Sequence, residues 1–140
     1  MSTKLSFILF IIILLASCKP KTEPNLLLGN WYGFDQDSAY YELYISDTLI
    51  ILNHENMGFA EYSYKKDGTK LITTTPLFFE RVWNLDSVND SIFILSDTLE
   101  THHYYRIDTP MDFFGSLKDS MEFAGFKEGF ISRNQKHKND

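Results

Sequence analysis

Residues 99–107, Leu-Glu-Thr-His-His-Tyr-Tyr-Arg-Ile, decide the fold class because their side chains alternate with a period of two. This alternation is typical of a half-buried β-strand. Similar runs recur between residues 26 and 107, separated by turn signals such as Ser46-Asp47 and Asp67-Gly68. With a first strand over residues 30–34, the spacing predicts an all-β fold, an antiparallel meander of about eight strands. The runs leave no room for a helix of normal length, which excludes a parallel sheet.

The composition indicates one folded domain and limits the class of function. The chain has 140 residues, which favours a single domain, and 16% of them are aromatic, which argues against disorder of the whole chain. Its 19 acidic residues outnumber 13 Lys and Arg, giving a net charge of −6. This balance argues against a nucleic-acid partner. Cys18 is the single cysteine, so an intramolecular disulfide and any Cys-x-x-Cys site are excluded.

The pattern changes after the last strand, and we expect a C-terminal helix. Ser116-Leu-Lys-Asp119 fits a loose capping box. The apolar residues that follow have near-helical spacing: Leu117, Met121, Ala124 and Ile131. Gly125 and Gly129 weaken this prediction, each by about 1 kcal/mol against Ala. A terminal hairpin around residues 127–129 is the alternative, and residues 134–140 form a polar tail that we expect to fray.

The N-terminus has the features of a processing signal. Lys4 precedes an apolar run of 12 residues from Leu5 to Ala16, which is short for a membrane-spanning helix. The next residues complete Leu15-Ala16-Ser17-Cys18, which resembles the lipobox of bacterial lipoproteins. The resemblance implies a diacylglyceryl group on the Cys18 sulfur and cleavage before Cys18. Residues 1–17 are then a signal peptide, and residues 18–27 are a lipidated cysteine followed by a polar tether.

The residues after the cysteine suggest where such a lipoprotein resides. Lys19 stands where an Asp would resemble an inner-membrane retention signal, and no acidic run of the surface-export kind follows Cys18. We therefore expect attachment to the bacterial outer membrane through the lipid, with the domain facing the periplasm. Two or more acyl chains suffice for stable anchoring.

The start of the first strand suggests how the meander is closed. Leu28 is followed by Gly29-Asn30-Trp31, and this Gly-x-Trp before an eight-strand meander resembles the lipocalin-like superfamily. The resemblance implies an eight-stranded barrel over residues 28–133 with Trp31 at its narrow end. It also implies that a basic residue of the last strand packs across the Trp, and Arg106 matches that position. A guanidinium over an indole contributes roughly 0.5–2 kcal/mol.

The sequence offers no pattern for catalysis, for a metal or for a cofactor. The histidines are His54, His102, His103 and His137. His102 and His103 are adjacent in a strand, so they point to opposite faces and cannot chelate one ion together. A Gly-x-Ser-x-Gly elbow and a phosphate loop are both missing from the sequence, and Cys18 should be lipidated. We therefore expect a protein that is not an enzyme and holds no metal or cofactor.

The alternation suggests which polar groups line the barrel interior. If Phe79 and Trp83 face the core, Arg81 does too, and the same logic points His103 and Tyr105 inward. A buried unpaired charge costs several kcal/mol, so Arg81 must have a partner. Arg81 could hold the carboxylate or phosphate of an amphipathic ligand, together with His103 and Tyr105. The favoured interpretation of Arg81 is an internal ion pair or a side chain that reaches the barrel mouth.

A triplet of Asp, Ser or Thr and an apolar residue occurs six times. Turn chemistry explains it, because Asp favours turns and Ser or Thr can begin a strand. The triplet also resembles the acceptor motif of periplasmic O-glycosylation in some Gram-negative bacteria. The hydroxyl residues concerned are Ser38, Thr48, Ser87, Ser91, Thr98 and Ser120.

Two functions remain open at this point. The leading one is a non-catalytic, membrane-anchored cell-envelope barrel that binds a small amphipathic ligand. The alternative is a structural or protein-interaction module of an envelope assembly, with a filled barrel. An open cavity would favour the ligand, whereas a filled interior beside an exposed apolar patch would favour a protein partner.

Overall fold

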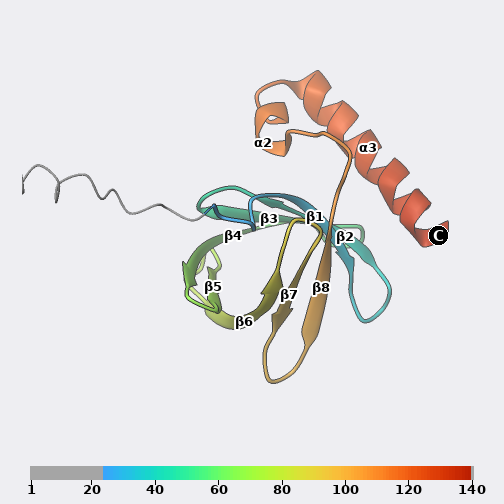
Figure 1. The fold of residues 1–140 in the computed structure, drawn as a ribbon. Helices are drawn as coiled ribbons and strands as arrows, with labels where there is room; N and C mark the ends of the chain where they lie inside the picture. Colours follow the sequence, from blue (N-terminus) through green and yellow to red (C-terminus); the bar gives the residue numbers. More distant parts are fainter. Residues whose placement is uncertain (1–23, 140) are drawn as a thin grey trace, which may run out of the picture.

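The computed structural model describes residues 24–139 and contains a closed antiparallel β-barrel (Figure 1). Each strand pairs with the next one along the chain, and the last strand pairs with the first. The strands are β1 (Gly29–Phe34), β2 (Tyr40–Ile45), β3 (Leu49–His54), β4 (Gly58–Asp67), β5 (Lys70–Thr74), β6 (Glu80–Val88), β7 (Ile92–Ser96) and β8 (Thr101–Arg106). Two helices follow, α2 (Phe113–Ser116) and α3 (Ser120–Asn139). The predicted all-β class, the eight strands, the barrel and the C-terminal helix are confirmed.

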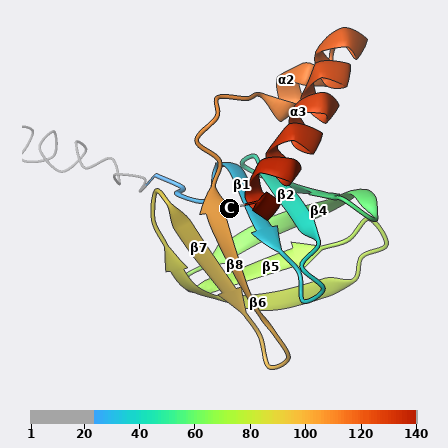
Figure 2. The ribbon, with the colours of Figure 1, turned by 90° about the vertical axis from the view of Figure 1, so that its right-hand side faces the viewer.

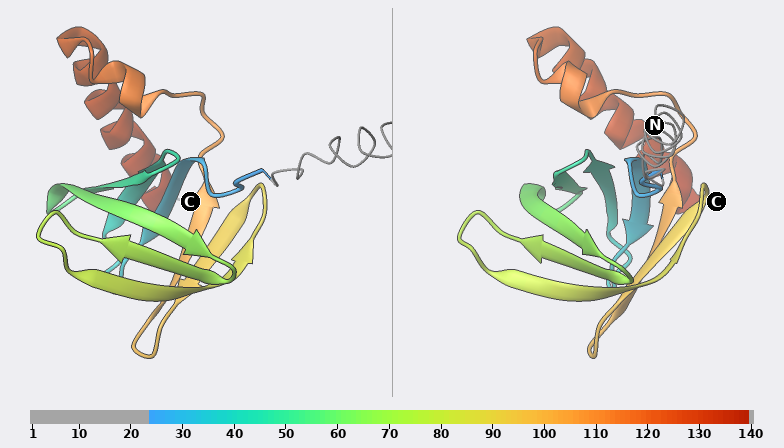
Figure 3. Two further views of the ribbon diagram at one scale, coloured as in Figure 1. Left: turned by 90° about the vertical axis from the view of Figure 1, so that its left-hand side faces the viewer. Right: turned by 60° about the vertical axis from the view of Figure 1, so that its left-hand side comes forward.

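The up-and-down order gives the barrel two different ends (Figure 3). The chain enters β1 at one end, which we call the closed end, and the turns β2–β3, β4–β5 and β6–β7 lie there too. The loops β1–β2, β3–β4, β5–β6 and β7–β8 lie at the opposite end, which we call the mouth. The first described residues and the mouth are therefore at opposite ends of the barrel.

The barrel is closed by a short seam between β1 and β8. Only two residue pairs are in register across this seam, Trp31 with Arg106 and Tyr32 with Tyr105. Other neighbouring strands share four to six pairs. The Arg106 guanidinium carbon lies 3.7 Å from the centre of the fully buried Trp31 ring. Its Nη1 and Nη2 donate to the carbonyls of Leu28 at 2.6 Å and Leu26 at 3.1 Å. This is the contact that the resemblance of the Gly-x-Trp segment implies.

Gly29 is required at the start of β1 for two reasons. Its φ of +117° is a conformation that L side chains rarely adopt. A Cβ at this position would also collide with the Arg106 guanidinium. The glycine of the Gly-x-Trp motif therefore makes room for the side chain that covers the tryptophan.

The fold has two apolar clusters, one inside the barrel and one outside it. The inner cluster consists of Leu27, Trp31, Tyr41, Leu43, Ile45, Ile50, Tyr64, Leu71, Trp83, Leu85, Phe93, Leu95 and Tyr104. In the outer cluster, Tyr44 and Ile51 pack against Phe113 and Phe126 of the two helices. Figure 2 shows α3 running across the barrel beside β1 and β2. Every residue of β2 is consequently buried, because one face packs on the core and the other lies under α3.

A buried carboxylate connects α3 to the barrel. Glu42 is fully buried on the outer face of β2, and both Nε and Nη2 of Arg133 donate to it, at 2.7 and 3.0 Å. The hydroxyls of Tyr40 and Tyr44 also donate to Glu42, each at 2.6 Å. Burial, together with the Glu42 charge, raises the pKa of both tyrosines well above its ordinary value, so both remain proton donors. A paired and hydrogen-bonded charge can be tolerated in such a site.

The N-terminal cap of the long helix differs from the prediction. Ser116 is the last residue of α2, and its hydroxyl donates to the Phe113 carbonyl at 2.7 Å. Asp119 caps α3 instead, because its Oδ1 accepts from the N–H groups of Met121 and Glu122. The predicted capping box therefore marked the right region but assigned the wrong capping residue.

The predicted fraying of residues 134–140 is wrong over the part that the structure describes. Helix α3 continues to Asn139. Asn134 and Lys138 both donate to Glu55 of the β3–β4 loop, at 2.6 and 2.7 Å. His137 stacks on Tyr32 with ring centres 4.0 Å apart. These contacts hold the last turns of the helix on the barrel, and the alternative hairpin is not formed.

The lipobox prediction, Leu15 to Cys18, lies outside the described residues, as do the predicted signal peptide and most of the tether. Over residues 24–139, neither helix has the length and apolar character needed to cross a membrane.

We predict that Trp31 and Arg106 contribute to stability as a coupled pair. Trp31→Ala should cost about 3–5 kcal/mol because it removes a fully buried ring. Arg106→Ala should cost about 1–2 kcal/mol through lost stacking and hydrogen bonds. The double variant should lose less than the sum by at least about 0.5 kcal/mol, measured by urea unfolding. Lys66→Ala, on an exposed residue of β4, is the control that should combine additively with Trp31→Ala. Strict additivity of Trp31→Ala and Arg106→Ala would contradict the closure.

Candidate functional site

The barrel interior contains a cavity of about 520 Å³ in the half that faces the mouth. Its wall includes buried residues such as Trp83, Leu95 and Tyr104, and exposed residues of the mouth loops such as Met57 and Phe79. The cavity therefore extends from the apolar core to the surface. The lining residues are Asp35, Tyr41, Leu43, Ile50, Leu52, His54, Met57, Tyr62, Thr73, Thr75, Phe79, Glu80, Arg81, Trp83, Leu95, Glu100, His102 and Tyr104.

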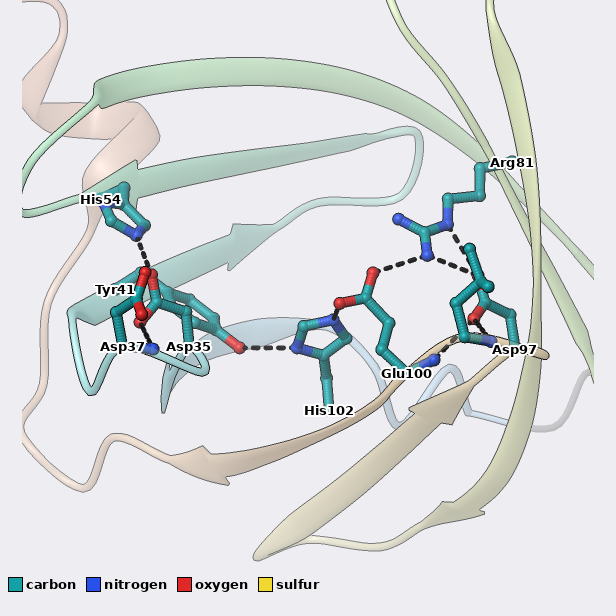
Figure 4. A network of polar contacts seen from close by, with 9 residues as sticks. Asp35, Asp37, Tyr41, His54, Arg81, Asp97, Glu100 and His102 are labelled. Carbon is teal, nitrogen blue, oxygen red and sulfur yellow. Dashed lines mark hydrogen bonds and ion pairs between the residues drawn. The ribbon is translucent and has the colours of Figure 1, made fainter.

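A chain of polar side chains crosses the mouth of this cavity (Figure 4). Arg81 Nη2 lies 2.5 Å from Asp97 Oδ2 and 2.6 Å from Glu100 Oε1. The other Glu100 oxygen lies 3.1 Å from His102 Nε2. His102 Nδ1 lies 3.4 Å from the Tyr41 hydroxyl. These residues come from β2, β6, β8 and the β7–β8 turn, so the network joins opposite walls of the barrel.

Arg81 forms the internal ion pair that the sequence favours, at the mouth and half exposed. Its guanidinium carbon lies 3.8 Å above the Trp83 ring. Burial lowers the pKa of Arg81, but the hydrogen bonds that Arg81 donates to Asp97 and Glu100 outweigh it and raise the pKa above its ordinary value. The hydrogen bond from Arg81, helped by the N–H groups of Leu99 and Glu100, lowers the pKa of Asp97 to about 2. The pair is therefore fully charged at neutral pH.

A second polar pair lies on the opposite side of the mouth. His54 Nε2 is 3.0 Å from Asp35 Oδ2, and the His54 ring stacks on Tyr41. The pKa of Asp35 is lowered, first by the hydrogen bond from the Ala39 N–H and also by His54. The carboxylate of Asp35 also accepts from the Asp37 N–H, so it shapes the β1–β2 loop.

Tyr41 reaches the network because Gly33 gives it space. A Cβ on Gly33 would lie 2.9 Å from the Tyr41 hydroxyl. Burial raises the pKa of Tyr41 to about 12. Its hydroxyl therefore stays protonated at neutral pH and can act as a hydrogen-bond donor in the part of the cavity near the mouth.

The expected inward orientation of His103 and Tyr105 is wrong. Both are exposed on the outer face of β8, and Tyr105 packs on Tyr32 of β1. His102 and Tyr104 point into the cavity in their place. The prediction was wrong because the alternation was counted from Leu99 as an inward-facing residue. Leu99 lies in the turn before β8 and is 85% exposed. The hypothetical ligand contacts of His103 and Tyr105 inside the barrel are therefore excluded, and of the three predicted residues only Arg81 lines the cavity.

The β5–β6 loop adds an apolar rim that the sequence reasoning did not assign to the mouth. Leu77, Phe78 and Phe79 are between 70% and 87% exposed. Thr75 organises the loop, since its carbonyl accepts from the Phe78 N–H and its hydroxyl from the Phe79 N–H. Phe78 adopts a φ of +64°, which is rare for a bulky residue. The sequence signal that could have identified this rim was the run of three apolar residues directly after Thr75-Pro76.

The residues predicted as possible glycan acceptors lie mostly on the surface. Ser87 is half-buried in β6, at a register shift that also places Asp86 in the strand rather than in the expected turn. The other acceptors are exposed: Ser38, Thr48, Ser91, Thr98 and Ser120. Asp97 and Asp119 accept backbone N–H groups two residues ahead, which is the turn role expected of the triplet.

Within residues 24–139, His, Asp and Glu side chains do not gather in the groups of three that a metal ion would need. No family model matches the chain, and neither a curated protein nor a solved structure is significantly similar to it. The cavity and its mouth are thus the features on which a function can be argued.

We predict that the carboxylates of the mouth make the protein sensitive to acid. Because Asp97 and Asp35 have lowered pKa values in the folded state, they stabilise the fold above about pH 4. This contribution should disappear as the pH falls from about 4 to about 2. Urea unfolding at several pH values should show it, and Asp97→Asn should flatten the pH dependence.

Asn at position 97 can still accept the N–H groups of Leu99 and Glu100, so this variant removes the charge and keeps the turn. Asp67→Asn, at the exposed last residue of β4 at the closed end, is the matched control. An unchanged slope for Asp97→Asn between pH 4 and 2 would show that the Arg81 pair is not the cause.

Proposed function

We propose that this protein is a non-catalytic binder of a small amphipathic ligand, whose apolar part occupies the barrel interior. The observation that carries the proposal is the cavity of about 520 Å³ between the core and the mouth. Ligand sites of proteins commonly have volumes of about 300–1,000 Å³ and mostly apolar walls with a few polar groups. This cavity has both properties.

The distribution of side chains along the cavity supports an amphipathic rather than a purely apolar ligand. The inner wall is built from buried apolar residues such as Leu43, Ile50 and Leu95. The charged side chains that line the cavity lie towards its mouth, and all of them except Glu80 belong to the Arg81 network or to the Asp35–His54 pair. Apolar surface removed from water contributes roughly 25 cal/mol per Å², so a tail gains most at depth. A polar head group gains most where hydrogen-bonding partners and water are both available.

The alternative, a filled barrel in an envelope assembly, is supported less. The cavity is the feature expected of a ligand binder, whereas the exposed side chains of Leu77 and Phe78 are the feature that favours a protein partner. Phe79 of the same loop lines the cavity. We therefore interpret the apolar rim as part of the ligand's entrance.

We also propose that the protein is a lipoprotein of the bacterial outer membrane, anchored through Cys18 and facing the periplasm. The sequence from Leu15 to Cys18 supports this proposal. The described chain begins beside the closed end, where Asn25 donates to Tyr64 of β4. The mouth lies at the opposite end of the barrel from these first described residues, which agrees with a ligand entering from the aqueous side.

We predict that the protein purified from its own membrane carries a small-molecule adduct in native mass spectra. Leu52→Trp should remove the adduct, because Leu52 lines the cavity and the larger indole side chain would fill part of the cavity. Val82→Trp is the matched control, since Val82 lies on the outer face of β6 between two residues that line the cavity. An adduct that survives Leu52→Trp, in a variant that still folds by circular dichroism, would place the ligand elsewhere.

We predict that Cys18→Ser prevents lipidation and signal removal before residue 18. The variant should remain unprocessed, or become soluble if another peptidase cleaves it, because only the thiol can form the thioether. Membrane fractionation and mass analysis of the N-terminus measure this. A variant that is still membrane-bound and processed to the same N-terminus would refute the anchor.

A further inference from the structure

The head group of the ligand can be inferred from the charges around the mouth. Four carboxylates belong to it, those of Asp35, Glu80, Asp97 and Glu100, against the single guanidinium of Arg81. Protonation of both His54 and His102 would still leave an excess of negative charge. The mouth therefore has a negative potential towards any group that enters the cavity.

The charge of Arg81 is already paired with two carboxylates. Its Nε and Nη2 donate to Asp97, Nη2 also donates to Glu100, and one face of the guanidinium covers Trp83. A carboxylate or phosphate that bound the remaining nitrogen, Nη1, would lie beside the charges of Asp97 and Glu100. This arrangement is unfavourable, because a like charge nearby raises the free energy.

A cation at the mouth, in contrast, would find a carboxylate that has no partner among the described residues. Within residues 24–139, no hydrogen bond or ion pair engages the Glu80 side chain, although Glu80 lines the cavity at its rim. The rings of Tyr41, Tyr62 and Phe79 also line the cavity, and aromatic faces attract cations. A positive head group could thus pair with Glu80 and leave the Arg81 network intact.

We infer that the ligand is a cationic amphiphile, with an amine or quaternary ammonium group at the mouth beside Glu80 and an alkyl or other apolar part in the cavity. This inference rests on the proposed function, and it specifies the chemistry of the ligand. It replaces the anionic head group that the sequence had made conceivable for Arg81.

The test compares three probes that share one alkyl chain: octyltrimethylammonium, octanoate and octyl glucoside. The full-length protein is held in phosphatidylcholine nanodiscs, and binding is followed by tryptophan fluorescence, since Trp83 lines the cavity. Empty nanodiscs correct for partition of the probes into lipid. The Kd of octyltrimethylammonium should be about tenfold lower than that of octanoate, with octyl glucoside between them.

Glu80→Gln should weaken binding of octyltrimethylammonium about two- to fivefold, as expected for an exposed ion pair, and should strengthen binding of octanoate. Glu61→Gln is the matched control, because Glu61 is exposed and pairs across strands with Ile51 of the outer cluster. It should leave the three affinities unchanged. Equal or tighter binding of octanoate in the unmodified protein would overturn the cationic head group alone. Failure of all three probes to bind would overturn the proposed function together with this inference.

Discussion

The stacking of the Arg106 guanidinium on the Trp31 indole is the interaction on which the rest of the structure depends. It joins the first strand to the last and thereby turns a meander into a barrel. The same contact decides which end of the barrel is filled. Trp31 packs edge-on against Phe93, and neither residue lines the cavity. The space inside the barrel therefore opens towards the mouth, and the position of the candidate site follows from the closure at the other end.

The helix gives the barrel a second asymmetry. Strand β2 is buried on both faces, and the Glu42–Arg133 pair fixes α3 over it. On the other side of the barrel, β4 and β6 have largely exposed outer faces, and the β5–β6 loop at the mouth carries the apolar rim. Local stability generally follows buried apolar contacts. We therefore expect higher local stability in the strands under α3. The part of the barrel that carries Arg81 and Phe79 packs on the core through its inner face only.

The sequence predicted the strands because their alternation is local, whereas the closure was predicted through the resemblance that the Gly-x-Trp segment carries. A period of two identifies strands. The pairing of Trp31 with Arg106 was implied by the resemblance, and the register of β1 and β8 agrees with it. The side chains of β8 that face into the barrel were predicted incorrectly, although the predicted contact between Arg106 and Trp31 was enough to identify them. If Arg106 covers Trp31 from inside the barrel, then Tyr104 and His102 must share its face, and His103 and Tyr105 cannot.

Other features could not be read from local pattern. Glu42 pairs with Arg133, which lies 91 residues away, and a charged residue in a strand suggests an exposed face unless the position of the helix is known. Similarly, Glu100 and His102 join Arg81 only because β6, β7 and β8 are in register. The ionic chemistry of the mouth is a product of strand pairing rather than of any short motif.

The shortness of the β1–β8 seam also bears on how copies of the chain interact. A closed barrel offers no free strand edge, which protects it from pairing with other molecules. With two register pairs, this seam is the shortest one between neighbouring strands of the barrel. Opening would expose two edges at once, each able to accept a strand from a second copy. By holding the seam shut, Arg106 thus protects the protein against aggregation and domain swapping, in addition to its role in the fold.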